Sequence, residues 1–107
     1  SFGMIKLTFK KNSRGFYDFK VVQDEVLLYT KEYTADKKYN DINLTQAEGF
    51  LAFNNFLQDQ ADLELEHNPD FKWNSFAEFK RWAGAKMQHK FFEHMYDYIE
   101  APKGEED

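Results

Sequence analysis

Three short segments in the first third of the chain alternate apolar with polar residues, which is the period of a half-buried β-strand. They are residues 4–10, 16–22 and 26–34. Turn-forming residues separate them, with Asn12-Ser13-Arg14-Gly15 after the first and Gln23-Asp24-Glu25 after the second. Connections this short join antiparallel neighbours. The pattern therefore predicts a three-stranded antiparallel β-meander whose apolar face needs cover.

Two helix-start patterns follow the strands. Thr45 with Glu48, and Ser75 with Glu78, each fit the capping box that opens a helix. The first helix is predicted over residues 45–66 and ends before Pro69, because the residue before a proline is pushed out of helical geometry. The second is predicted over residues 75–100, with Gly84 as a potential bend. Two long helices are therefore expected to pack on the sheet.

These elements predict one α+β domain over residues 4–101, a normal size for a single hydrophobic core. We interpret residues 1–3 as a cloning remnant before Met4, and residues 102–107 as an acidic, solvated tail. Residues 35–44 are polar, and their sequence is compatible with either a loop or one short helix.

The segments FKKNSRGFYDFK (residues 9–20) and EVLLYTKEYT (residues 25–34) resemble the small YegP-like bacterial repeat. In that family a strand, a glycine turn and two further strands precede a short helix. The resemblance covers residues 4–44 and implies a β-β-β-α start. Asp24 and Glu25 stand where the family has Asn-Gly, and the two long helices have no counterpart in it. The family has no assigned activity, so the resemblance implies nothing about function.

The net charge of −5 is distributed unevenly along the chain. No Lys or Arg occurs in residues 39–71, a window that contains seven acidic residues. At 100° per residue, the first helix collects its polar residues on one narrow stripe. The stripe consists of Glu48, Asn55, Asp59, Asp62 and Glu66. We call its four carboxylates, Glu48, Asp59, Asp62 and Glu66, the acidic ridge.

Aromatic residues make up 19% of the chain, including 12 Phe, more than a core of this size needs. The first helix has a predicted core stripe of Ala47, Phe50, Leu51, Phe53, Leu57 and Ala61, and Phe56 lies on its second side. In the second helix, the apolar arc is wider than packing against a single neighbouring element requires. The additional apolar residues are Phe92, Tyr96 and Ile99. Because such an arc needs cover, we predict a homodimer through the second helix.

Basic and aromatic residues interleave on the strands and in the first turn. The candidates are Lys10, Lys11, Arg14 and Lys20 with Phe16. Such a face could stack bases and follow phosphates, as in proteins that bind single strands. The alternative is that lysines keep an antiparallel sheet soluble and its edges unpaired. Since the net charge is negative, we rank nucleic-acid binding second.

No motif in the sequence predicts catalysis. The absence of cysteine excludes disulfides and thiol nucleophiles. His89 and Glu93 are four residues apart and offer two metal ligands, fewer than the three or four that a metal site needs. Carboxylate pairs lack a neighbouring nucleophile or glycine-rich loop. We therefore predict a non-enzymatic protein without metal or cofactor. Because the chain has no cysteine, a reducing, cytoplasmic location is the default expectation. No apolar run is long enough to span a bilayer.

The sequence thus favours a protein-binding module that presents the acidic ridge to a partner with a basic surface. Its size and charge suit a small adaptor or inhibitor of bacterial or phage origin. The alternative for the ridge is a plain solvated helix face. The residues predicted to bind the partner are Glu48, Asp59, Asp62, Glu66, Phe56, Phe92, Tyr96 and Ile99.

Overall fold

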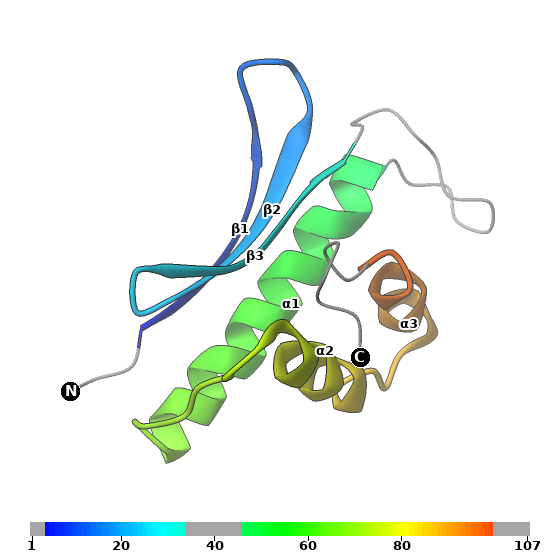
Figure 1. Ribbon diagram of the computed structural model, residues 1–107. Coiled ribbons are helices and arrows are strands. Elements are labelled where there is room, and N and C mark those ends of the chain that lie inside the picture. The colour runs from blue at the N-terminus through cyan, green and yellow to red at the C-terminus, as the bar shows by residue number, and fades with distance from the viewer. Residues whose placement is uncertain (1–3, 34–45, 100–107) are drawn as a thin grey trace.

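The computed structural model of the chain describes residues 4–33 and 46–99 (Figure 1). Its elements are β1 (Ile5–Lys11), β2 (Tyr17–Gln23), β3 (Val26–Tyr33), α1 (Gln46–His67), α2 (Phe76–Ala85) and α3 (Lys90–Tyr96). The predicted α+β class and the three-stranded meander are confirmed. The predictions for residues 1–3, 35–44 and 102–107, and for Thr45 as a helix cap, lie outside the described residues.

The sheet has the order β1-β2-β3, and both pairs of strands are antiparallel. In the first turn, the Asn12 carboxamide oxygen accepts hydrogen bonds from the backbone N–H groups of Arg14 (2.9 Å) and Phe16 (3.1 Å). The second turn is tighter, with Asp24 and Glu25 at φ values of 51° and 68°. Two consecutive left-handed residues twist the hairpin in the direction that strands require. The turn therefore adopts this geometry without the Asn-Gly pair that usually provides it.

The edge strand β3 contains an irregularity at Leu28. Val21 lies opposite Tyr29 and Val22 lies opposite Leu27, so Leu28 has no residue opposite it in β2. Such a bulge adds one residue to a strand and bends it. The regular part of β3 is therefore interrupted close to the second turn.

All three helices lie on one side of the sheet, and α1 runs along its length (Figure 1). Phe50 of α1 lies at the centre of the interface. Its ring centroid is 4.3 Å from that of Tyr33, 5.4 Å from that of Phe9 and 5.9 Å from that of Phe19. The largest fully buried side chains are Phe19, Phe50, Phe53, Phe79, Leu57, Met95 and Val21. Much of the aromatic surplus is therefore inside the protein.

Polar side chains of α1 bind the outer backbone edge of β1. The Gln58 carboxamide accepts a hydrogen bond from the N–H of Leu7 (2.8 Å) and donates one to the carbonyl of Ile5 (3.0 Å). One turn earlier, the buried Asn54 carboxamide donates to the carbonyl of Leu7 (3.0 Å). These backbone groups point away from β2. The amides therefore take the place that another strand would occupy.

Replacing Gln58 by leucine should destabilise the protein by about 1–3 kcal/mol, because the N–H of Leu7 and the carbonyl of Ile5 lose their partner. Urea denaturation measures the change. Gln60→Leu, a side chain on the same helix, is the matched control and should stay within about 0.5 kcal/mol of the wild type. Equal stability of the two variants would show that the edge contacts contribute nothing.

The prediction of one long second helix is wrong. Ser75 caps α2 as expected, since its hydroxyl accepts a hydrogen bond from the N–H of Glu78 (3.2 Å). The helix ends at Ala85, however, and α3 begins after His89, whose Nδ1 accepts a hydrogen bond from the N–H of Phe91 (3.1 Å). The chain turns in this connection, which we define as residues 86–89. The turn brings α3 back against α1 and α2, where Met95 is fully buried.

Contacts between α2 and α3 hold the turned-back segment. The Lys80 ammonium donates hydrogen bonds to the carbonyl of Tyr96 (3.1 Å), the last residue of α3, and to that of Ile99 (2.6 Å), three residues later. The Tyr96 hydroxyl in return donates to the carbonyl of Lys80 (3.1 Å). A Cβ on Gly84 would lie 2.9 Å from that hydroxyl oxygen, so glycine makes room for the tyrosine. The packing of Tyr96 on Gly84 would be impossible if the two residues belonged to one straight helix.

Gly84→Ala should therefore destabilise the protein by about 1 kcal/mol, because the new methyl group displaces Tyr96. In a Tyr96→Ala background the same substitution should stabilise the protein by up to about 1 kcal/mol, the usual helix preference for alanine over glycine. Chemical denaturation of the four proteins gives the coupling. The same effect of Gly84→Ala in both backgrounds would contradict the close packing.

Candidate functional site

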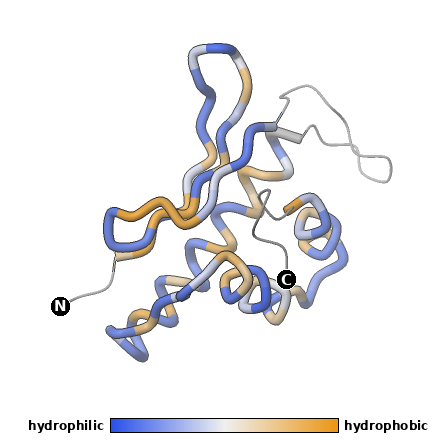
Figure 2. The backbone as a smooth tube through the Cα atoms, viewed as in Figure 1, coloured by the Kyte–Doolittle hydropathy of each residue, from blue (hydrophilic) through white to orange (hydrophobic). Residues whose placement is uncertain are grey.

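The acidic ridge lies on the exposed face of α1. Glu48, Asp59, Asp62 and Glu66 are all exposed. The last three occupy consecutive turns at the C-terminal end of the helix, where hydrophilic residues predominate (Figure 2). Asp62 also accepts a hydrogen bond from Gln58 (3.0 Å), the residue that binds the β1 edge. The opposite face of α1 is buried against the sheet, so the ridge is carried by a fixed element.

Two leucines flank the ridge. Leu51 is 51% exposed and Leu63 is 48% exposed. The prediction that Leu51 belongs to the core stripe is wrong, because it lies about 100° around the helix from the mean direction of Phe50, Leu57 and Ala61. The exposed face of α1 thus combines carboxylates with apolar side chains.

A shallow hollow opens at the Glu48 end of the ridge. It has a volume of about 260 Å³ and is lined by Phe9, Tyr17, Glu48 and Leu51. The rings of Phe9 and Tyr17 are stacked, with centroids 5.0 Å apart. The floor is therefore aromatic, while a carboxylate stands at the rim.

The other predicted partner-binding residues pack largely within the protein. Ile99 is buried. The Phe92 ring stacks on Phe56 with centroids 4.2 Å apart, and Tyr96 packs on Gly84. The expectation that a second molecule must cover this apolar arc is therefore wrong for Ile99. For Phe92 and Tyr96 it has less support, because each already packs on a residue of the same chain. The homodimer stays a prediction, without this apolar arc as its reason.

One acid of the cation-free window is neutralised by a distant residue. Glu64 accepts hydrogen bonds from the Lys86 ammonium (2.8 Å) and the Trp82 indole N–H (3.3 Å). These two bonds, with the Lys86 bond first, hold the pKa of Glu64 below its ordinary value. The charged pair fixes α1 to the end of α2.

A lowered carboxyl pKa stabilises the folded protein at pH values above the unfolded pKa, and this stabilisation is lost as the pH falls through the folded pKa. For Glu64 the loss therefore begins below about pH 4.5. Glu64→Gln should lower the free energy of unfolding at neutral pH by up to about 1 kcal/mol. It should also make the decrease in this free energy at acidic pH less steep. Thermal melts at several pH values test this. Glu66→Gln, on the exposed ridge, is the control and should leave the acid decline steep.

The structure does not bring the five nucleic-acid candidates together. Lys10 and Lys20 lie on the sheet face away from the helices, whereas Lys11 alternates to the other face. Arg14 pairs with Glu32 and covers the ring of Phe16 at 5.3 Å. That pairing lowers the pKa of Glu32. The basic side chains and the aromatic rings therefore do not form one continuous surface on which nucleobases could stack.

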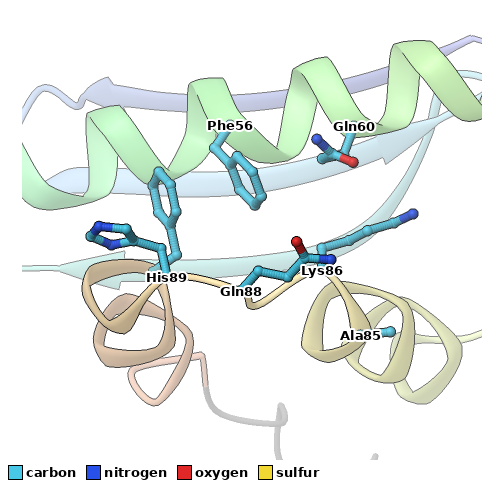
Figure 3. Close-up of a pocket in the computed structure, with 7 residues that line it drawn as sticks. Phe56, Gln60, Ala85, Lys86, Gln88 and His89 are labelled. Atoms are coloured by element: carbon cyan, nitrogen blue, oxygen red, sulfur yellow. The ribbon is translucent and has the colours of Figure 1, made fainter.

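A second hollow lies between α1 and the connection at residues 86–89 (Figure 3). Its volume is about 310 Å³, and it is lined by Phe56, Gln60, Ala85, Lys86, Gln88, His89 and Phe92. No local sequence pattern predicts this hollow, because it exists only where the chain turns between α2 and α3. His89, considered as a metal ligand with Glu93, is instead the N-cap of α3.

Within residues 4–33 and 46–99, no group of three or more potential metal ligands converges. None of the described helices has the length and apolar character needed to cross a bilayer. Comparisons of the chain with protein-family models, curated proteins and solved structures find no match. The resemblance of residues 4–44 to the YegP-like repeat stays a prediction.

Proposed function

We propose that the protein is a non-enzymatic, cytoplasmic binding module that presents the exposed face of α1 to a protein with a basic surface. The observation that carries the proposal is the combination of Asp59, Asp62 and Glu66 on consecutive turns with exposed leucines beside them. Carboxylates a turn apart repel one another by a few tenths of a kcal/mol per pair. A folded protein gains nothing from this repulsion, whereas a basic partner would relieve it.

The hollow beside Glu48 supports the same proposal. Interfaces depend on a few apolar anchors in pockets, while charges around them guide the encounter. The aromatic floor formed by Phe9 and Tyr17 suits an apolar side chain, and Glu48 suits a lysine or arginine next to it. The face thus provides an anchor at one end and steering charges at the other.

The experiment starts with capture of the partner from nuclease-treated lysate, followed by association kinetics with the purified partner. The ridge variant carries Asp59→Asn, Asp62→Asn and Glu66→Gln. Its melting temperature should equal or exceed that of the wild type, because repulsion is removed. Its association rate should fall about tenfold at low salt, as expected when steering charges are lost.

A charge-matched control carries Glu25→Gln, Glu93→Gln and Asp97→Asn, three exposed acids outside α1. It should associate at the wild-type rate. Leu51→Ser should act differently from the ridge variant, by raising the dissociation rate, since it removes an apolar side chain at the anchor. If the ridge variant binds the partner at the same rate as the control, the ridge is only a solvated face.

A further inference from the structure

The hollow at residues 86–89 has the dimensions of a small-molecule site. Its volume of about 310 Å³ is at the lower end of the range for ligand pockets. Figure 3 shows Phe56 and Gln60 pointing from α1 toward the connection, and Gln88 pointing from the connection toward α1. Side chains from separate parts of the fold therefore converge on one space, on a different side of α1 from the acidic ridge.

One wall of this hollow is aromatic and flat. The rings of Phe56 and Phe92 are stacked between α1 and α3 with an interplanar angle of 13°, so each covers one face of the other. The outer face of Phe56 is the flat surface that this hollow offers to a ligand. A flat apolar wall favours a planar ring system, because stacking buries the ligand's face without requiring it to bend. The shape of the wall thus favours a planar ligand over an aliphatic one.

Two of the four polar side chains around this wall are carboxamides. The side chains of Gln60 and Gln88 make no hydrogen bond to residues 4–33 or 46–99. Each carboxamide offers a donor beside an acceptor. His89 adds a donor, because its Nδ1 accepts the Phe91 N–H and the proton of the neutral ring is therefore on Nε2.

The charge balance of the hollow favours a neutral ligand. Its one lysine, Lys86, donates to Glu64 at 2.8 Å, so the positive charge is compensated within the protein. The chain as a whole carries a net charge of −5, and the acidic ridge lies on the same helix. An anionic ligand would meet repulsion without a free cation in the lining to offset it.

We propose that this hollow binds a neutral, planar nitrogen heterocycle of nucleobase size that carries a donor beside an acceptor on one edge. Adenine is the simplest example, since a glutamine carboxamide pairs with its N6 amino group and N7 through two hydrogen bonds. The ring stacks on Phe56, and the Gln88 carboxamide binds the edge, with Gln60 beside it in the lining. This function is separate from the proposed protein-binding role of the α1 ridge.

The test is a titration with adenosine, followed by NMR of the isotope-labelled full-length protein. Adenosine should shift the side-chain amide signals of Gln60 and Gln88. Gln88→Ala should weaken binding about tenfold, the cost of one bidentate base contact. The Gln88 side chain is exposed and makes no hydrogen bond to the described residues, so the variant should fold normally. Asn55→Ala, which removes an exposed carboxamide on the ridge side of α1, should bind adenosine like the wild type.

Two further ligands test which group of the base is recognised, and whether the base is free or part of a nucleic acid. N6,N6-dimethyladenosine lacks the donor and should bind about tenfold more weakly than adenosine. Oligodeoxyadenylate presents the same base on an anionic strand. Tighter binding of this strand than of adenosine would assign the hollow to a base within nucleic acid, and the reverse order would assign it to a free heterocycle. Absence of shifts at Gln60 and Gln88, or equal binding by Gln88→Ala, would overturn the proposal.

Discussion

The hydrogen bonds from Asn54 and Gln58 to the backbone of β1 decide where α1 lies on the sheet. Apolar packing alone is tolerant of sliding, because aromatic rings accept several arrangements of similar energy. An amide that pairs with a particular N–H and carbonyl of a strand does not accept a shift of one residue. The direction of the exposed α1 face, and with it the position of every carboxylate on the ridge, follows from these bonds.

The turn between α2 and α3 has a comparable role at the other end of the molecule. Lys80 binds the carbonyls that close α3, and Glu64 with Lys86 connects the end of α2 to α1. Both hollows lie beside α1, but only the one at residues 86–89 depends on this turn. The two proposed binding roles of the molecule therefore depend on different contacts and can be removed independently.

Local sequence patterns were sufficient for much of the fold. Alternation predicted the three strands, and the Ser75 capping box predicted the start of α2. The break at residues 86–89 was not predictable from local pattern. It contains no proline, and the contact that favours it joins Gly84 to Tyr96, a pair that meets only after the chain has turned. The exposure of the ridge was predictable from the helical period. The burial of Ile99 and the convergence of the amides at the second hollow were not, because both depend on tertiary contacts.

The bulge at Leu28 has a consequence for how copies of this chain behave beside one another. A small sheet normally risks growing, because a free strand edge is a template for the next molecule's strand. Here the edge of β1 is occupied by side-chain amides, and the bulge interrupts the edge of β3. Both edges of the sheet are thus poor templates for a strand of another copy, in a protein that carries 12 Phe and exposed leucines.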